Sequence, residues 1–192
     1  MEIVHKPVLL REALEYLAPE RGGRFVDGTL GQGGHAEQIL SRHPSSELLG
    51  IDRDAGALAV AAERLAPFGS RVKLFRGEYS RMEEFVGEAG WGKVDGILLD
   101  IGFGSHQLDD PGRGFSFRVD APLDMRMDRR SRQTAATLLN HSPEAELARI
   151  FREYGEEPQA RRLTAAIVRR RQERPWTSTG ELAALIVETI RN

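Results

Sequence analysis

The fold is decided by the stretch Phe25-Val26-Asp27-Gly28-Thr29-Leu30-Gly31-Gln32-Gly33-Gly34-His35-Ala36, where an apolar strand ends in an acid and enters a turn rich in glycine. Glycine lacks a Cβ atom, so the backbone can turn sharply there and approach a ligand closely. The helix that follows directs unpaired N–H groups at that ligand. The spacing is G-x-x-G-x-G-G rather than the G-x-G-x-x-G of dinucleotide sites. The turn therefore predicts a site for a nucleotide-like ligand without a pyrophosphate.

A second acid strengthens this prediction. The apolar run Leu48-Leu49-Gly50-Ile51 ends in Asp52. In a doubly wound α/β fold, a carboxylate at the tip of the second strand accepts hydrogen bonds from both ribose hydroxyls. Taken alone, Asp52 is equally compatible with a turn residue, and Asp54 is a candidate N-cap for a helix over residues 55–65. The glycine turn and the acid together favour the binding site.

Strand and helix patterns alternate through the first half of the chain. Strands are predicted at 24–27, 47–52, 72–75 and 94–100, and helices at 7–18, 35–42, 55–65 and 81–88. This alternation is typical of right-handed βαβ units and a parallel sheet, whose ligands bind beyond the carboxyl ends of the strands. The glycine turn, Asp52, Tyr79 and Asp100 are expected at that edge.

Composition excludes several classes of protein. The 192 residues are 40% hydrophobic and include no cysteine, which excludes disulfides, thiolate metal sites, iron–sulfur clusters and a cysteine nucleophile within the chain. No apolar run approaches the roughly 20 residues that span a bilayer. The amino terminus lacks the pattern of a signal peptide. We expect a cytoplasmic protein without a membrane segment, and without a metal because no His-x-x-x-His motif or acid cluster is visible.

The second half of the chain differs in charge and pattern. Net charge is −2, but residues 109–192 carry 15 basic and 13 acidic groups, whereas residues 1–108 carry 12 and 16. The pattern becomes helical from Ser142, which is a candidate N-cap ahead of Pro143, and a capping box is predicted at 178–181. We expect two domains, 1–104 and 105–192. The chain ends within a helical pattern, and strand 94–100 is apolar on both faces, which suits a central strand. These features predict a fragment with missing strands, low stability and a tendency to self-associate.

The residues after the fourth strand suit chemistry on an aromatic amine. Such an amine is a poor nucleophile because its lone pair is delocalised, and acceptors for its protons favour a pyramidal nitrogen. Asp100 is one candidate acceptor, and carbonyls of the turn at 102–105 are others. Phe103 is a candidate stacking platform for a base, although a packing role is the commoner use of such a residue. Tyr79 is likewise suited to stacking on adenine or to packing a helix end.

Several motifs resemble the bacterial S-adenosylmethionine-dependent methyltransferases that modify the N4 amine of a cytidine in 16S ribosomal RNA. The resemblance covers essentially the whole chain. It rests on five runs: His5-x-Pro7-Val8-Leu9-Leu10, Asp27-Gly28-Thr29 through Gly33-Gly34-His35, Ile51-Asp52-Arg53-Asp54, Val94 through Asp100, and Gln107-Leu108-Asp109-Asp110-Pro111 with the Arg113–Phe117 and Pro122–Asp128 segments. The last run is the most specific.

The resemblance implies a Rossmann-like methyltransferase fold with a helical inserted domain, S-adenosylmethionine as the cofactor and small-subunit ribosomal RNA as the partner. The residues that match the cofactor contacts of the family are Gly33, Gly34, His35, Asp52, Tyr79, Asp100 and Gln107. The family usually has Phe in place of Tyr79, and Leu-Gly-Val-Ser-Ser in place of Ile101-Gly102-Phe103-Gly104-Ser105. The second difference lies at the expected target pocket.

Arginines of the second half are candidates for phosphate contacts, namely Arg161, Arg162, Arg169, Arg170 and Arg171, although a solvated helix face is the simpler interpretation. Two further functions are compatible with the same residues. One is methylation of another amine or of a small molecule by an enzyme of this fold. The other is a noncatalytic RNA-binding or assembly role, which would not need the cofactor.

Overall fold

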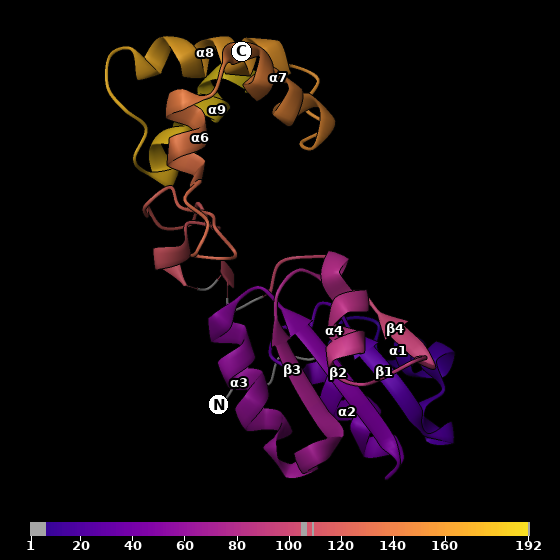
Figure 1. The fold of residues 1–192 in the computed structure, drawn as a ribbon. Coiled ribbons are helices and arrows are strands. Elements are labelled where there is room, and N and C mark those ends of the chain that lie inside the picture. Colours follow the sequence, from indigo (N-terminus) through magenta and orange to yellow (C-terminus); the bar gives the residue numbers. More distant parts are fainter. Residues whose placement is uncertain (1–6, 105–106, 109, 192) are drawn as a thin grey trace. The chain divides into compact units, whose positions relative to one another are not determined.

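A four-stranded parallel sheet organises the first part of the chain (Figure 1). The computed structural model describes residues 7–104, 107, 108 and 110–191. The strands are β1 (Gly23–Asp27), β2 (Ser46–Asp52), β3 (Val72–Arg76) and β4 (Gly96–Leu98), in the order β3-β2-β1-β4. Every neighbouring pair is parallel. The chain builds outward from β1 to β3 and then returns to the other side of β1, so the strand order reverses between β1 and β4.

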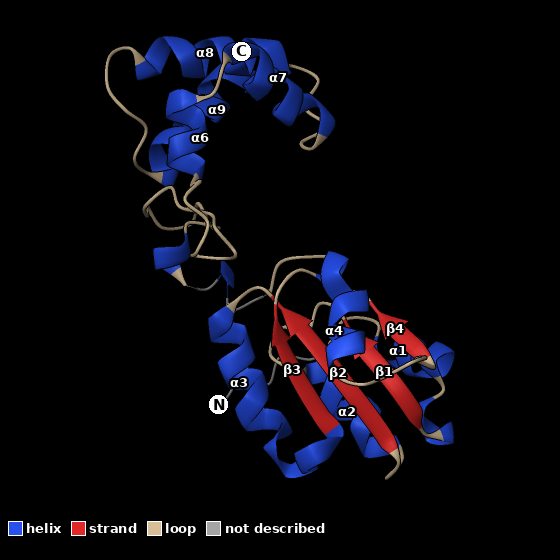
Figure 2. Ribbon diagram, in the orientation of Figure 1, coloured by secondary structure: helices blue, strands red, loops and turns tan. Residues whose placement is uncertain are grey.

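Helices cover both faces of this sheet, as Figure 2 shows. They are α1 (Leu10–Leu17), α2 (Gly34–Arg42), α3 (Ala55–Leu65) and α4 (Met82–Glu88), with short 3-10 turns η1 (Pro19–Arg21), η2 (Ala66–Arg71) and η3 (Tyr79–Arg81). The predicted doubly wound, Rossmann-like α/β fold is thereby confirmed. In such folds the point where the strand order reverses is the place where ligands bind.

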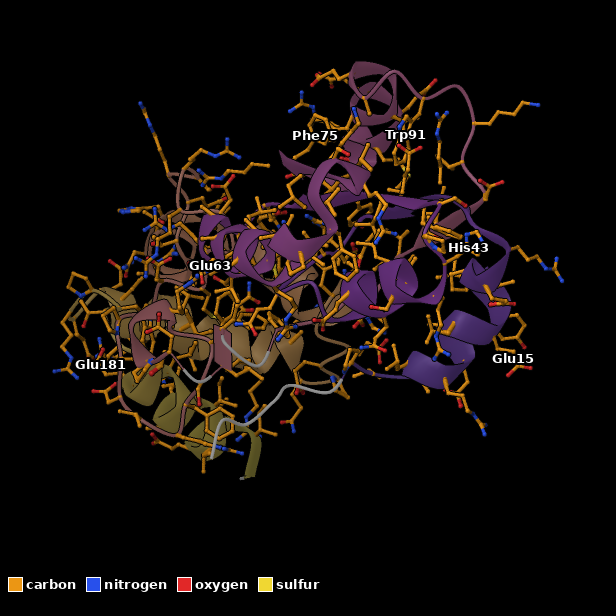
Figure 3. All side chains as sticks on the ribbon, turned by 90° about the horizontal axis from the view of Figure 1, so that it is seen from below. Glu15, His43, Glu63, Phe75, Trp91 and Glu181 are labelled. Carbon is orange, nitrogen blue, oxygen red and sulfur yellow. The ribbon has the colours of Figure 1, made fainter. Side chains whose placement is uncertain are left out.

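Alternation along the strands separates two apolar cores. Phe25 packs with α1, α2 and α3 in one cluster, whereas its neighbour Val26 packs in another with Phe85 of α4 and with Trp91. Successive side chains of a strand point to opposite faces, so one strand serves both clusters. Figure 3 shows Phe75 and Trp91 beside α4, on the face served by Val26.

Two elements differ from the sequence prediction at their ends. Helix α1 begins at Leu10 rather than at Pro7, because Leu9 has a left-handed backbone (φ 49°) and the carbonyl of Val8 is bonded to the ring of His35. Strand β4 comprises only Gly96–Leu98 of the predicted 94–100. It ends where the N–H of Asp100 leaves the ladder for the side chain of Thr29.

Two apolar side chains at β4 are exposed: Ile97 and Leu99, at 49% and 41%. Ile97 is in register with Val26 of β1. The sequence predicts a central strand here, and among the described residues β4 pairs only with β1. The sheet formed by these residues therefore ends in a strand with exposed apolar side chains.

The second unit, Phe103–Asn192, is helical and is described by itself. It contains the 3-10 turn η4 (Pro111–Arg113) and the helices α6 (Ala135–His141), α7 (Glu144–Glu153), α8 (Ala160–Arg171) and α9 (Thr179–Arg191). Their core is formed by six buried residues: Leu123, Leu139, Leu147, Leu163, Ile167 and Trp176. Helix α6, which the sequence pattern missed, contributes Leu139 to it.

An irregular stretch before α6 is held by side chains rather than by regular hydrogen bonding. The guanidinium of Arg113 donates to the carbonyls of Arg126 and Met127, at 3.0 and 3.1 Å. Arg126 in turn bonds both carboxylate oxygens of Asp124 at 2.7 Å. Gly114 has a φ of +69°, and a Cβ atom there would collide with the carbonyl of Pro122. The most specific motif of the sequence therefore has a structural use.

The starts of α7 and α9 differ in their capping from what the sequence predicts. Ser142 ends α6 instead of capping α7, whose N-cap is Pro143 without a side-chain hydrogen bond. The predicted capping box is half formed. The hydroxyl of Ser178 accepts the N–H of Glu181 at 3.3 Å, while the carboxylate of Glu181 pairs with Arg174 at 2.6 Å. A nearby guanidinium is the stronger partner for that carboxylate.

Candidate functional site

The glycine turn after β1 is held closely to the sheet. The Asp27 carboxylate accepts the N–H of Thr29 at 3.2 Å, and the carbonyl of Ile51 on β2 accepts the N–H of Leu30 at 3.0 Å. Gly31 and Gly33 have φ values of +53° and +80°, a region that side-chain-bearing residues rarely adopt. The two glycines are therefore required by the path of the backbone.

Helix α2 starts at this turn. Its N-cap is Gly33, and no side chain caps the helix there. The first amides of a helix lack intrahelical partners, and the helix dipole makes that end slightly positive. The N–H of Gly33 itself donates to the carbonyl of Leu30 at 2.9 Å, so the candidate donors for a ligand are the amides of α2 that follow Gly33. Their use by a small ligand stays a prediction.

Asp52, at the end of β2, connects three segments. Its carboxylate accepts the N–H of Gly31 at 2.8 Å through one oxygen and the N–H of Asp54 at 2.8 Å through the other. Its carbonyl accepts the N–H of Gly77 after β3. The turn role and the binding role considered for Asp52 are compatible, because each carboxylate oxygen has a second lone pair available to a ligand hydroxyl.

Tyr79 lies close to the glycine turn. It begins η3 and is 40% exposed. A Cβ atom added to Gly28 would come within 3.1 Å of Tyr79 and 2.6 Å of the Leu99 side chain. Gly28 therefore allows side chains that follow β3 and β4 to close on the turn that follows β1. The Cβ atom of Tyr79 thus lies beside the turn, and stacking of its ring on a base stays a prediction.

Asp100 follows β4 at the same edge. Its N–H donates to the hydroxyl of Thr29 at 2.6 Å, and its side chain is exposed within the first unit. Asp27, Asp52 and Asp100 come from the ends of three neighbouring strands, β1, β2 and β4. Among the described residues, no group of three acidic, histidine or cysteine side chains is arranged to hold a metal ion.

Asp27 is a buried acid whose pKa is shifted. Burial raises the pKa of its carboxyl to about 7, and the nearby charges of Asp52 and Asp100 act in the same direction. The hydrogen bonds from Thr29 oppose the shift. Desolvation and like charges both disfavour the ionised form of a carboxyl group. The floor of the site therefore holds a carboxyl that exchanges its proton near neutral pH.

The remaining predicted contacts are placed as follows. The ring of His35 is buried, and its Nε2 lies 2.9 Å from the carbonyl of Val8, so this side chain anchors the segment before α1. Gln107 belongs to the second unit, where its side-chain oxygen accepts the N–H of Gly104 at 3.3 Å. His5, Ser105, His106 and Asp109 lie outside the described residues.

Asp27 and Thr29 were not among the predicted site residues. Asp27 is the last residue of the first strand, so its position was visible in the sequence. The sequence did not reveal that Asp27 is buried or that it is bonded to Thr29. Thr29 has no signal in a single sequence beyond its place between two glycines.

Two of the five candidate phosphate-binding arginines are used inside the helical unit. Arg171 donates to the carbonyls of Leu139 and Ser142, at 2.9 and 2.8 Å, and Arg170 lies over the ring of Trp176. Their guanidinium groups stabilise the ends of neighbouring segments, and contact of any of the five arginines with RNA stays a prediction. Three remain exposed, namely Arg161, Arg162 and Arg169.

A glycine turn, an uncapped helix start and an acid at the second strand tip, all at the point of strand reversal, define an α/β protein of the class that binds nucleotide-like ligands. The chain belongs to the MraW methylase family, whose pattern it matches over residues 2–192. This agrees with the resemblance seen in the sequence.

Curated relatives are similar along nearly the whole of this chain. A protein of Geotalea uraniireducens named ribosomal RNA small subunit methyltransferase H is 52% identical over 183 residues, which are 95% of this chain and 59% of the relative. A protein of the same name from Symbiobacterium thermophilum is 49% identical over 99% of this chain and 60% of its own length. The chain thus spans about 60% of the length of these relatives.

No helix in the described part of the chain is long and apolar enough to cross a membrane.

Proposed function

We propose that the first unit binds S-adenosylmethionine and that the chain is part of an enzyme that methylates the N4 amine of a cytidine in small-subunit ribosomal RNA. The proposal is supported by membership of a methylase family and by the names of relatives about 50% identical to this chain. The observation that carries it is the glycine turn at the switch point, with Asp52 bonded across it. Such an enzyme would work in the cytoplasm.

The residues at this edge fit the cofactor by their donors and acceptors. The first amides of α2, beyond Gly33, offer donors to a carboxylate, since helix starts favour negative charge. Asp52 offers acceptors to ribose hydroxyls, and the ring of Tyr79 offers a face to a base. Gly31 leaves space on its Cβ side, where the nearest atom is 3.9 Å away. His35 and Gln107 stay predictions from the family resemblance.

S-adenosylmethionine supplies an electrophilic methyl group on a sulfonium. The part assigned to this chain is to orient the acceptor amine. A carboxylate oxygen of Asp100 would accept a hydrogen bond from the N4 amine, which favours a pyramidal nitrogen and stabilises positive charge as the new bond forms. Phe103, 58% exposed in the second unit and 5.3 Å from the ring of Phe115, is a candidate to stack on the target base. The amine proton would leave to solvent.

Calorimetric titration with S-adenosylmethionine tests the cofactor site. Asp52→Asn is expected to weaken binding about tenfold or more, because its side-chain N–H₂ would face a main-chain N–H where a carboxylate oxygen now accepts one. The exposed Glu20→Gln is the matched control, and its affinity should equal that of the wild type. Circular dichroism checks that each variant is folded. A folded wild-type chain that does not bind the cofactor would contradict this part of the proposal.

Methyl transfer tests the substrate. Small ribosomal subunits lacking the modification are incubated with the chain and S-adenosylmethionine carrying a labelled methyl group, and the RNA is digested to nucleosides. The label is expected in N4-methylcytidine. Label in another amine would favour the alternative enzyme of the same fold. RNA binding that persists without cofactor, with no transfer, would favour a noncatalytic role.

The exposed arginines of α8 provide a separate test of RNA binding. Replacing Arg161, Arg162 and Arg169 by Glu should weaken RNA binding and reduce its dependence on salt, because each phosphate contact contributes to that slope. The matched control reverses three arginines that are already paired with acids: Arg81, Arg130 and Arg149. An unchanged salt slope in the first variant would remove α8 from the RNA interface.

A further inference from the structure

The end of the β1–β4 ladder is completed by a side chain. Asp27 is in register with Leu98, and the N–H of Gly28 donates to the carbonyl of Leu98 at 3.0 Å. In a regular parallel pair, the next bond would run from the N–H of Asp100 to the main-chain carbonyl of Gly28. Here the backbone turns away after Gly28. The hydroxyl of Thr29 accepts the N–H of Asp100 instead, at 2.6 Å.

That hydroxyl is itself fixed from below. The buried carboxyl of Asp27 accepts the N–H of Thr29 and is also hydrogen-bonded to the Thr29 side chain. A hydroxyl has one proton to donate and lone pairs to accept with. The consistent assignment is that Thr29 donates to Asp27 and accepts from Asp100. The three residues form a chain of hydrogen bonds across the point where the strand order reverses.

We propose that Thr29 is a positioning residue: its hydroxyl, held by Asp27, fixes the main chain of Asp100 and so directs the Asp100 carboxyl to the cofactor and the target amine. This rests on the proposed function, because the role of Asp100 is part of that proposal. The effect is local, since Thr29 acts at the last rung of the sheet and not within the apolar cores. A displacement of about 1 Å at such a position is costly for catalysis.

Substitutions at Thr29 separate the hydroxyl from the shape of the side chain. Thr29→Val keeps the branched shape and removes the acceptor, whereas Thr29→Ser keeps the hydroxyl and removes the methyl group. Thr164→Val is the matched control, because the hydroxyl of Thr164 in α8 is buried and has no hydrogen-bond partner among the described residues. Two quantities are measured: hydrogen exchange of the Asp100 amide by NMR, and the dissociation constant of S-adenosylmethionine by calorimetry.

Thr29→Val is expected to speed exchange of the Asp100 amide about tenfold or more and to weaken cofactor binding about tenfold, as loss of a hydrogen bond of ordinary strength would do. Thr29→Ser should remain within about threefold of the wild type in both, and Thr164→Val should change neither. Where transfer is measured, Thr29→Val should lower kcat more than it raises the KM for RNA. Rescue by Ser and the kcat effect would not follow from a purely structural role.

Several outcomes would overturn the inference. One is a folded Thr29→Val chain with wild-type exchange at Asp100 and wild-type affinity for the cofactor. If Thr29→Val does not fold, Thr29→Ser is compared with Thr29→Ala, and equal behaviour of these two would overturn it. A wild-type chain that fails to bind S-adenosylmethionine contradicts the proposed function instead. Exchange at the Asp100 amide in the Ser and Val variants then still decides whether Thr29 holds that segment.

Discussion

The sheet unit and the helical unit use their polar side chains differently. In the sheet unit, Asp52 and Thr29 accept hydrogen bonds from main-chain groups at the strand tips, and their oxygens have further lone pairs with which to accept. In the helical unit, Arg113, Arg126 and Arg171 are engaged with carbonyls and carboxylates of their own unit. A candidate site is therefore recognised by hydrogen-bond donors and acceptors that the fold itself does not use up. A count of charged residues does not reveal it.

The largest expected effect tests whether the two units are separate. Trp176→Ala removes a large buried side chain from the helical core, which should cost that unit about 3–5 kcal/mol of unfolding free energy. The chain has two tryptophans, so Trp91 then reports on the sheet unit alone. In urea, circular dichroism should show earlier loss of helix, while the Trp91 fluorescence transition stays in place. Equal shifts of both signals would show that the units unfold as one.

The next effect concerns pH. The unfolding free energies of the two units are expected to change in opposite directions as the pH rises. Asp27 has a pKa raised to about 7 in the folded chain, so the folded state keeps a proton that the unfolded state has lost. The unfolding free energy of the sheet unit should therefore fall as pH rises from about 4 to 7, and level off above 7. Asp27→Asn removes this titration. The difference between variant and wild type should change by at most about 3 kcal/mol between pH 5 and 8.

The measurement is urea unfolding at several pH values, followed by Trp91 fluorescence in chains that carry Trp176→Phe, so that Trp91 is the one tryptophan. In the helical unit, the hydrogen bond from Arg126 holds the pKa of Asp124 below its usual range. That stability is present above pH 4 and is lost as pH falls further. If the difference in unfolding free energy between Asp27→Asn and the wild type does not vary with pH, the carboxyl of Asp27 does not cause the pH dependence.

A third test compares one arginine in each unit. Arg71 donates to the carbonyls of Leu40, His43 and Ser46, and Arg171 donates to those of Leu139 and Ser142. Both close the end of a helix and the segment after it. Arg71→Met and Arg171→Met should each cost about 1–3 kcal/mol, because buried carbonyls lose charged partners. Each loss should appear only in the unit that contains the substitution, as read by the fluorescence of Trp91 in a Trp176→Phe background and of Trp176 in a Trp91→Phe background.

The smallest effect has the opposite direction. Thr164 is fully buried in α8 and its hydroxyl has no partner among the described residues. Thr164→Val should leave the helical unit unchanged or stabilise it by up to about 1 kcal/mol, because an unpaired buried hydroxyl is removed without a change of shape. Thermal unfolding by circular dichroism measures it. A destabilisation above 1 kcal/mol would show that the hydroxyl has a partner, for example bound water.

Much of the architecture was predictable because it depends on local patterns. Alternating apolar strands and amphipathic helices fix the βαβ units, and the glycine spacing before α2 fixes the turn. Element ends were less predictable. Helix α1 starts late because Val8 is bonded to His35, 27 positions along the chain. Helix α6 follows directly on an irregular stretch that is held by contacts between distant side chains, and the pattern alone did not separate the two.

The sequence by itself determined the fold class and the family, and it predicted the edge of the sheet for the site, since each depends on short runs of residue types and their spacing. Only the tertiary structure decided how the polar groups are shared. It bonded the hydroxyl of Thr29 to the amide of Asp100, buried the carboxyl of Asp27 beside Thr29, and engaged Arg170 and Arg171 with groups of their own unit. The physical reason is that a hydrogen bond between residues 71 positions apart depends on the register of the strands that bring them together, which no local pattern contains.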